Sequence, residues 1–548
     1  MKQLKALCII VLLTLIAACT KAGTSTENTA GGGGHNGFTQ AHYLRFADAG
    51  GDLSTLNPVI NSETRLAHIT QMTMAYLARY DHNNKPIPEL LTVIPTEANG
   101  GISKDGKTIT WHLRKGVKWS DGAPFNADDM VFSTNVVNNK ANNVVGRDGW
   151  NLITKMDEPD KYTVVYHLSK PYAAYLPTFF GTAGANPCLL PKHLLGDLPN
   201  INQAPYNAKP VGIGPFRVVA WKRGDSVELE ANPYYWRGLP KLKRVTYKLT
   251  ADRNTLLTQI QTGDVDLWPL VPAGYIDRAK SVATFETVVV PSYYFAHIDM
   301  NLKNPILQDV RVREALRYAL DRKTLVDKTV YGYGILQETM VSPANPVSDQ
   351  KVAAVPFDLA KAKQLLDDAG WKVGPDGIRV KDGKKLTLHF ASYTGAPDTD
   401  NRIELMRSNW KDAGIEIQLQ KYAPAVFFEQ PNGIVYGGKF DLTTFSWGGD
   451  VIGELSNLYE CNQAPPNGQN MMHYCNPKVD AAMEHFKASY EPAVRQPYSN
   501  FEQEQITSDV PTIVLYVLKD GFSYNRDLKG YSPNQVTPFD DMMNVDIQ

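Results

Sequence analysis

Two local patterns recur along this chain and limit the folds open to it: strand-like alternation broken by Asp-Gly turns, and amphipathic helices. Residues 103–135, SKDGKTITWHLRKGVKWSDGAPFNADDMVFSTN, contain both patterns. The alternation predicts two strands, with Asp-Gly turns at 105–106 and 121–122, because such dipeptides favour tight hairpins. A helix follows, with Asn126 as its N-cap and Asp129 three residues further on.

The second half of the chain repeats this mixture. Residues 310–326 and 357–371 have the spacing of amphipathic helices. The second of them begins after Asp358, a typical N-cap, and stops at Gly370. A third Asp-Gly turn, at 382–383, leads into the alternating run KLTLHF. Because strands and helices do not alternate regularly, we predict α+β or mixed α/β domains. The apolar face of the first helix consists of Val312, Ala315, Leu316, Ala319 and Leu320.

Residues 101–108, GISKDGKT, match the phosphate-binding pattern G-x-x-x-x-G-K-[ST] at every fixed position. That pattern binds nucleotide only where the glycine-rich loop leaves a buried strand and opens a helix. Here the preceding residues are polar and turn-prone, and the following TITWHLR alternates as a strand does. We therefore interpret the segment as a hairpin with a type I′ turn at Asp105-Gly106, and not as a nucleotide site.

The N-terminus has the features of an export signal. Residues 1–18 combine Lys2 and Lys5 with an apolar run that is too short for a permanent membrane helix. The run ends in small residues before Cys19, which resembles a bacterial lipobox and implies an acylated Cys19; secretion with loss of Cys19 is the alternative. Residues 19–41 continue as a small, polar, flexible tether.

Charge and length limit the function and the number of domains. Without the signal, 54 basic and 57 acidic side chains remain, which does not suit nucleic acid binding. The remaining roughly 530 residues exceed one hydrophobic core, so we expect two or three domains. Export favours disulfides, and a Cys461–Cys475 bond would close a short loop, leaving Cys188 as a buried thiol.

No catalytic or metal-binding signature stands out. The motifs H-E-x-x-H and G-x-S-x-G are absent, and His473 with Cys475 lacks a second pair of ligands. A Ser/His/Asp site stays open, because such triads are set by geometry rather than by sequence order. We predict a binding protein without cofactor or metal, and not an enzyme.

Six blocks of sequence carry a resemblance to a known family. They are TLNPVINSE (55–63), SKDGKTITWHLRKGVKWSDGAPFNADDMVFS (103–133), VGIGPFRVVAWKRGDSVELEANPYYW (211–236), IQTGDVDLW (260–268), MNLKNPILQDVRVREALRYALDR (300–322) and FDLAKAKQLLDDAGW (357–371). Together, and in this order, they resemble the family 5 extracellular solute-binding proteins, the peptide and nickel receptors of ABC importers. The resemblance runs from about residue 42 to the C-terminus.

The resemblance implies a mixed α/β fold like that of class II periplasmic binding proteins, with two lobes around a hinged cleft and an inserted extra domain. We expect domain I to be discontinuous, with domain II inserted in it and domain III facing it across the cleft. The expected boundaries are 42–80, 205–296 and 510–548 for domain I, 81–204 for domain II and 297–509 for domain III. The hinge strands are expected near 292–301 and 510–517.

In the peptide-binding branch of the family, a W-x-x-D segment supplies a carboxylate for the ligand's α-ammonium. This chain has Trp447-Gly448-Gly449-Asp450 after a strand-like run. The resemblance therefore implies that Asp450 holds the ammonium, whereas an isolated Asp here would be read as a turn residue. The two glycines fit a close ligand approach or a sharp turn, and Trp447 either walls a pocket or lies in the core. Cys461 and Cys475 resemble the cysteine pair that flanks this site in dipeptide receptors.

Other ligand contacts are less defined. In dipeptide receptors an Arg holds the ligand's C-terminal carboxylate, and Arg402 or Arg407 lies in about the right region; either is equally readable as a solvated helix residue. Glu63 either meets the ligand from domain I or is an exposed loop acid. Tyr293 and Tyr294, near the expected hinge, line the cleft or pack in the core.

The function implied is that of a substrate-binding lipoprotein, anchored outside the cytoplasm to a bacterial membrane. It would bind short peptides as a monomer and deliver them to an ABC permease whose ATP is hydrolysed by a separate subunit. A nickel chelate, an oligosaccharide or another solute on the same fold is the first alternative. An exported hydrolase and a peptide sensor without a transporter are alternatives of other classes.

Overall fold

The predicted signal peptide, Cys19 and most of the predicted tether lie outside the residues that the structure describes. None of the helices within those residues has both the length and the apolar character needed to cross a membrane. The fold below is that of residues 38–548. The computed structural model describes residues 36–50, 52–61, 63–74, 76–81, 85–147, 149–181, 187–429, 432–449, 451–533, 538–539 and 541–548.

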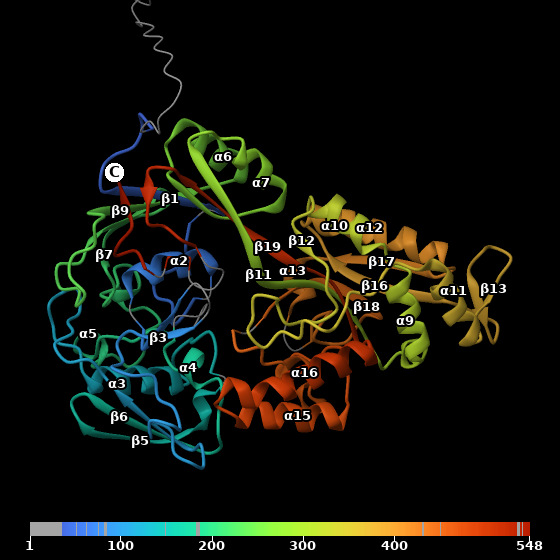
Figure 1. Ribbon diagram of the computed structural model, residues 1–548, viewed down its shortest axis with the longest axis horizontal. Helices are drawn as coiled ribbons and strands as arrows, with labels where there is room; N and C mark the ends of the chain where they lie inside the picture. The colour runs from blue at the N-terminus through green and yellow to red at the C-terminus, as the bar shows by residue number, and fades with distance from the viewer. Residues whose placement is uncertain are drawn as a thin grey trace, which may run out of the picture. The chain divides into compact units, whose positions relative to one another are not determined.

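One large mixed sheet runs through the protein (Figure 1). Its order is β17-β16-β18-β11-β19-β10-β1-β9-β8-β7, and β12 pairs with β19 beside this path. Parallel pairs join β1 to β9 and β10, and β16 to β17 and β18, whereas the remaining pairs are antiparallel. The strands are β1 (Tyr43–Ala49), β7 (Phe216–Lys222), β8 (Ser226–Ala231), β9 (Arg244–Thr250), β10 (Leu267–Val271), β11 (Phe285–Met300), β12 (Gly334–Ile335), β16 (Thr387–Tyr393), β17 (Glu416–Tyr422), β18 (Leu442–Gly448) and β19 (Thr512–Asn525).

The long antiparallel strands β11 and β19 connect the two parts of this sheet. The C-terminal half of β19 pairs with β10, and the C-terminal half of β11 pairs with β18. Their register shifts between Pro291 and Phe295 of β11, where β11 bulges against β19. This pairing places the predicted hinge segments side by side, and the mixed α/β class is confirmed. The domain boundaries stay a prediction.

Four smaller sheets complete the strands of the described residues. One of the two three-stranded sheets, β4-β6-β5, contains the hairpin that begins at residue 101. Their members are β2 (Ala78–Tyr80) with β3 (Pro86–Pro88); β4 (Thr108–His112), β5 (Ile153–Asp160) and β6 (Thr163–Leu168); β13 (Lys372–Val373), β14 (Arg379–Lys381) and β15 (Lys384–Lys385); and β20 (Leu528–Lys529) with β21 (Asp546–Ile547).

The hairpin at 101–108 is confirmed, but its turn is not type I′. Ser103 N–H donates to Thr108 O over 3.0 Å, so the loop between these two residues is four residues long. Gly106 has a positive φ of 66°, whereas Asp105 does not, and the Asp105 carboxylate accepts from Lys107 N–H over 3.2 Å. Type I′ geometry belongs to two-residue loops, and Asp382-Gly383, with φ of 50° and 75°, has it.

The helices lie on the faces of the sheets and in the connections between them (Figure 1). The capping box of Asn126 with Asp129 is present at the start of α3, and Asp358 caps α11. The helices are α2 (Thr64–Thr73), α3 (Ala127–Asn138), α4 (Tyr175–Thr178), α5 (Lys192–Leu195), α6 (Arg253–Thr262), α7 (Ala273–Lys280), α8 (Pro305–Gln308), α9 (Val310–Tyr318), α10 (Arg322–Thr329), α11 (Leu359–Asp368), α12 (Pro397–Asp412), α13 (Pro424–Phe427), α14 (Ser456–Tyr459), α15 (Pro477–Ala488) and α16 (Pro492–Asp509), with 3₁₀ turns η1 (Trp150–Leu152), η2 (Pro205–Asn207) and η3 (Cys461–Gln463).

The single helix predicted over 310–326 is instead two helices, α9 and α10. Asp321 begins the second one, because its carboxylate accepts from Thr324 N–H over 3.0 Å and from the Thr324 hydroxyl. A side chain that caps a new helix ends the preceding one. The predicted apolar face survives the break, since all five of its residues are buried.

Buried apolar residues form separate clusters along the chain. One contains residues between Val59 and Ile213 together with Tyr490. A second combines residues 44–72, 216–247, Leu267 and 524–547. Two more lie between residues 295 and 517, under and over β11, β18 and β19. The chain therefore builds several cores rather than one, as its length predicts.

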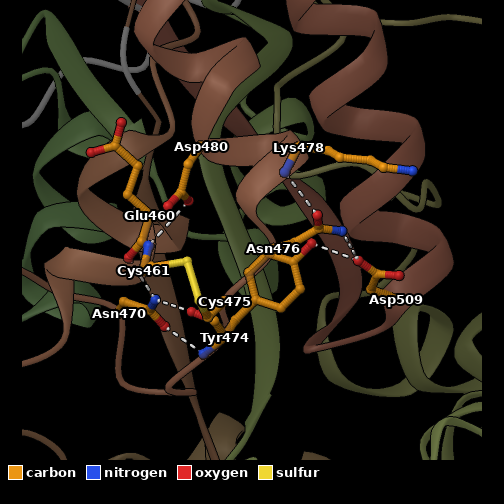
Figure 2. The surroundings of a disulfide bond; sticks show 9 residues. All are labelled: Glu460, Cys461, Asn470, Tyr474, Cys475, Asn476, Lys478, Asp480 and Asp509. Carbon is orange, nitrogen blue, oxygen red and sulfur yellow. Dashed lines mark hydrogen bonds between the residues drawn. A yellow bond between two sulfur atoms is a disulfide. The ribbon is translucent and has the colours of Figure 1, made fainter.

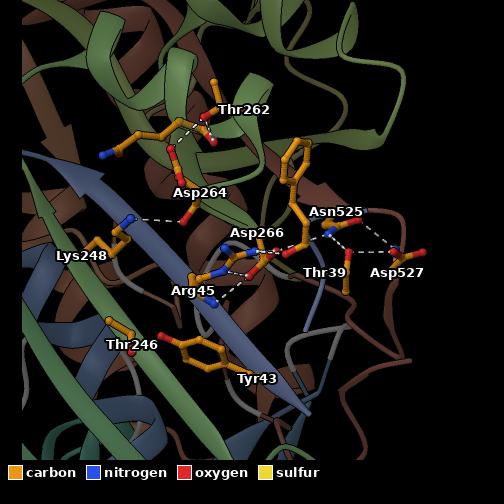
Figure 3. Close-up of polar contacts among 12 residues, drawn as sticks. Thr39, Tyr43, Arg45, Thr246, Lys248, Thr262, Asp264, Asp266, Asn525 and Asp527 are labelled. Atoms are coloured by element: carbon orange, nitrogen blue, oxygen red, sulfur yellow. Dashed lines mark hydrogen bonds and ion pairs between the residues drawn. The ribbon is translucent and has the colours of Figure 1, made fainter. Parts of the chain in front are cut away.

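A buried ion pair joins three strands of the large sheet (Figure 3). Arg45 of β1 donates from Nε and Nη2 to the two oxygens of Asp266, each over 2.8 Å, and its backbone N–H donates to the same carboxylate. Asn525, at the end of β19, donates to Asp266 as well, over 3.3 Å. Asp266 is almost fully buried and lies just before β10, so the pair fixes β1, β10 and β19 together.

Candidate functional site

The sequence predicts a ligand site at the end of β18. One edge of this strand is paired with β11. Asn301 N–H donates to Asp441 O, and Gly449 N–H donates to Tyr293 O over 2.8 Å. The register between β18 and β11 has no shift. The backbone N–H and C=O groups of the odd-numbered residues of β18 therefore point toward β11. The backbone groups of Ser446 and Gly448 therefore point to the opposite edge.

That opposite edge is open along the last residues of β18. The parallel neighbour β16 pairs with β18 only at Phe390↔Leu442 and Ala391↔Thr443. Among the described residues no other strand pairs with β18 there. Ser446 and Gly448 are exposed, so their N–H and C=O groups are available to another extended chain.

Gly448 and Gly449 both lie close to residues of β11. A Cβ on Gly449 would lie 2.9 Å from the carbonyl oxygen of Tyr293, and one on Gly448 would lie 3.1 Å from the ring of Tyr294. Neither glycine has a positive φ. Close approach of the two strands therefore accounts for Gly449, a reason that the sequence alone does not suggest, whereas at Gly448 the neighbour is the ring of the exposed Tyr294.

The three aromatic residues predicted near the cleft differ in burial. Tyr293 is buried, whereas Tyr294 is 48% exposed and covers Gly448. Trp447 is half-buried, with its ring centroid 5.1 Å from that of Phe445 and stacked on His297 at 6.2 Å. Tyr294 is thus open to a ligand, and Trp447 lies between core and surface.

Asp450, the predicted ammonium partner, lies outside the described residues. The chain continues at Val451 and Ile452, which form part of a cavity of about 340 Å³. Apolar side chains from two distant parts of the chain line most of this cavity. Those on one side include Ile94, Ile102 and Tyr175, and those on the other include Val347, Val451 and Ile452.

A second cavity, of about 610 Å³, is lined by residues between 145 and 187 on one side and between 454 and 487 on the other. It is more polar than the first, and its lining includes amide, hydroxyl and charged side chains. Ala173 lines both cavities. The polar lining includes Asn151, Lys170, Glu454, Ser456, Asn467 and Lys487.

The predicted Cys461–Cys475 disulfide is present, with its Cα atoms 4.4 Å apart (Figure 2). Inside its loop, the fully buried Asn470 side chain donates to Glu460 O and Tyr474 O and accepts from Tyr474 N–H. Gln463 and Asn467 of the loop line the larger cavity. The disulfide therefore holds one wall of that cavity.

The double substitution Cys461→Ser/Cys475→Ser should lower the free energy of unfolding by about 3 kcal/mol, because the bond closes a loop with a sequence separation of 14. Thermal unfolding with and without a reductant measures this. Reductant should lower the melting temperature of the wild type and leave that of the variant unchanged. Equal melting temperatures for oxidised and reduced wild type would contradict the prediction.

The third cysteine, Cys188, is free and buried, as predicted. Burial raises the pKa of its thiol to about 12. It therefore does not supply a thiolate at neutral pH.

The two candidate arginines have different environments. Arg402 is buried in α12, where its guanidinium donates to Tyr516 Oη over 2.7 Å and to Thr399 Oγ1 over 3.3 Å. No described carboxylate lies within ion-pair distance of Arg402, and its Nε lacks an acceptor among the described residues. Arg407 is more exposed and pairs with Glu404 over 3.0 Å. Arg402 is thus the better placed of the two to take an anionic partner.

Glu63 precedes α2 and is half-buried. Its carboxylate pairs with Arg65 over 2.5 Å and accepts from Asn61 Nδ2 over 2.9 Å. A ligand amine would have to compete with Arg65 for this carboxylate.

Two acidic residues with raised pKa values are not evident from the sequence. Asp520 lies in β19 opposite Val290, between the two parts of the sheet, and burial raises its pKa to about 6. Glu502 of α16 is 1% exposed and neither of its oxygens has a hydrogen-bond partner among the described residues. Burial, with Glu454 and Glu460 nearby, raises the pKa of Glu502 to about 9, and Lys487 opposes the shift.

Glu502→Gln should raise the free energy of unfolding at pH 8 by about 1–3 kcal/mol, because a buried unpaired carboxyl is costly there. The folded state keeps the Glu502 proton to a higher pH than the unfolded chain. The stability that depends on it is therefore complete below pH 4.5 and is lost as the pH rises toward 9. Urea unfolding at several pH values should show a flatter profile for the variant. Exposed Glu504→Gln on the same helix is the control, and equal profiles for the two variants would contradict the prediction.

Comparison with known proteins identifies relatives over nearly the whole chain. Oligopeptide-binding protein AppA of Bacillus subtilis (strain 168) is 28% identical over 553 residues, which cover 98% of this chain and 96% of that protein. The structure of AppA from Bacillus subtilis in complex with a nonapeptide superposes with a TM-score of 0.74 at 25% identity, covering 92% of this chain and 98% of the other.

A metal-chelate complex has the same fold. NikZ from Campylobacter jejuni in complex with Ni(L-His) superposes with a TM-score of 0.73 at 26% identity, covering 90% of this chain and 96% of that one. Residues 85–469 match the family model described as bacterial extracellular solute-binding proteins, family 5 Middle. That match spans more than half of the chain, and the chain therefore belongs to the family 5 bacterial extracellular solute-binding proteins.

Proposed function

We propose that this protein is an extracytoplasmic receptor that binds short peptides in extended form between its lobes and delivers them to the permease of an ABC importer. The observation that carries the proposal is the open edge of β18, where the backbone groups of Ser446 and Gly448 face away from β11. This edge leads directly toward the loop that lines both cavities.

An extended peptide is the ligand class that such an edge fits best. Its main chain pairs with the strand whatever its sequence, and its side chains enter neighbouring pockets. We propose that Asp450, one residue beyond Gly449, takes the α-ammonium through a charge-assisted hydrogen bond. Tyr294, whose ring lies beside Gly448, is exposed to such a ligand, and we propose Arg402 for the carboxylate end.

The ligands in the complexes of the two structural relatives, a nonapeptide and Ni(L-His), support two solute classes, a peptide and a nickel–amino acid chelate. The peptide is favoured here because the open strand edge offers backbone partners, which a compact chelate does not use. The alternatives from other classes, a hydrolase or a sensor without a transporter, gain no support from any described cluster of side chains.

We further propose that Cys19 carries the acyl chains that anchor the protein to a bacterial membrane. The tether of residues 19–41 would let a monomeric receptor reach the permease. Family membership supports an importer as the partner, and ATP would be hydrolysed by a separate subunit.

Native mass spectrometry of residues 20–548, before and after mild denaturation and refolding, tests the ligand class. Co-purified peptides released by denaturation would support the proposal and give the preferred length directly. A bound metal or sugar in place of peptide would leave the family assignment intact and would contradict the proposal that the ligand is a peptide. Peptides recovered shortened after incubation would point to the hydrolase instead.

A further inference from the structure

A single tyrosine joins two parts of the protein that are far apart in the sequence. Tyr490 lies between α15 and α16, and its hydroxyl donates to Gly106 O over 2.6 Å and accepts from Tyr172 N–H over 3.0 Å. Its ring meets that of Tyr175 edge-on at 5.3 Å. All three partners belong to the region that contains the 101–108 hairpin and the loop after β6.

Tyr490 packs in the hydrophobic core formed by residues 59–213, although it lies far from them in the sequence. It is 7% exposed and lies in a cluster whose other buried members all fall between Val59 and Ile213. The helices on either side of it lie in the part of the protein that contains β18 (Figure 1). The side chain is therefore inserted from one lobe into the core of the other.

The hairpin that resembles a phosphate loop is the acceptor for this side chain. Gly106 offers its carbonyl oxygen to Tyr490, and a Cβ on Gly106 would lie 3.0 Å from both the Tyr490 ring and Pro171. The glycine thus provides both the turn and the space for the ring.

A second contact reinforces the first. Ala173 N–H donates to Lys487 O over 2.9 Å, three residues before Tyr490. Lys487 is itself held by Glu460 over 2.5 Å and by Glu484 over 2.7 Å. Glu460 precedes Cys461 of the disulfide. The Ala173–Lys487 contact is therefore linked to a segment that the disulfide holds in position.

The contact lies between the two cavities. Ala173 lines both cavities, Tyr490 lines the smaller one and Lys487 lines the larger one. The partners of Tyr490 and Lys487 described above all belong to the protein itself.

We propose that Tyr490 is a clasp that holds the two lobes together in the ligand-free protein, and that the clasp must open before a ligand enters. The free protein then populates a closed form, and ligand binding shifts an equilibrium that already favours closure. The clasp also separates the space between the lobes into an apolar and a polar chamber.

Tyr490→Phe tests the clasp, because it keeps the ring and removes both hydrogen bonds. Spin labels on Lys155→Cys of β5 and Lys478→Cys of α15, both exposed, report the distance between the lobes. Ligand-free wild type should give one short distance. The variant should add a longer one, with the closed-to-open ratio lowered about five- to tenfold. Exchange of the Tyr172 amide hydrogen should rise by a similar factor.

Two controls separate the clasp from general loosening. Tyr498→Phe, in the neighbouring helix α16, removes a hydroxyl from a ring that stacks on His485 and should leave the distances unchanged. Gly106→Ala and Gly116→Ala both place a Cβ on a backbone with positive φ, but only the first meets Tyr490, since Gly116 has no atom within 4 Å. Gly106→Ala should open the protein and Gly116→Ala should not.

Three results would overturn the proposal: an open distance distribution in ligand-free wild type, a Tyr490→Phe variant that matches wild type, or equal behaviour of the two alanine variants. None of these measurements requires the ligand. A failure of the peptide proposal would therefore leave the test of the clasp intact.

Discussion

Asp450→Asn is expected to weaken the binding of peptides with a free amino terminus by about 30- to 1000-fold. The substitution keeps the size of the side chain and removes the charge that we assign to the α-ammonium. Leaving that ammonium without its partner in a closed cleft costs about 2–4 kcal/mol. Isothermal titration of the refolded, ligand-free protein with a co-purified peptide measures the loss.

An N-acetylated form of the same peptide separates the role of Asp450 from a general effect on the cleft. Wild type and Asp450→Asn should bind the acetylated peptide with equal, weak affinity, because neither can form the charged pair. A variant that binds the free peptide as tightly as wild type would overturn the assignment. Equal losses for both peptides would point to damage to the cleft instead.

Glu338→Ala should produce the largest loss of stability, about 3–5 kcal/mol, because it leaves the buried Arg322 guanidinium without its carboxylate, whereas Arg317 keeps Glu314. Glu338 is 4% exposed and pairs with Arg322, which is equally buried. Its second oxygen lies 3.8 Å from Arg317 Nη1, and its first accepts from Val355 N–H over 2.6 Å. One side chain thus connects α9, α10 and the loop before α11.

Urea unfolding followed by circular dichroism measures the Glu338→Ala effect. Glu404→Ala is the matched control, since Glu404 also pairs with an arginine but is 61% exposed at its side chain, and it should change stability by less than about 1 kcal/mol. Similar losses for the two variants would contradict the distinction between buried and exposed pairs.

Local structure was largely predictable from neighbouring residues. The capping box at Asn126, the cap at Asp358 and the Asp-Gly turn at 382–383 all depend on residues within a few positions of one another. The turn at 105–106 was predicted in the right place with the wrong geometry. There, the Ser103–Thr108 pairing and the contact of Gly106 with Tyr490 decide the loop.

The family, the mixed α/β class and the disulfide could be predicted from ordered blocks and local chemistry in the sequence, whereas the role of the segment that ends in Asp450 stays a prediction. The tertiary structure was needed to show that Ser446 and Gly448 face an open edge, because this depends on where β16 stops pairing with β18. It alone placed Tyr490 against Gly106, 384 residues away. Such contacts follow from how separate cores pack together, and no local pattern in the chain records that packing.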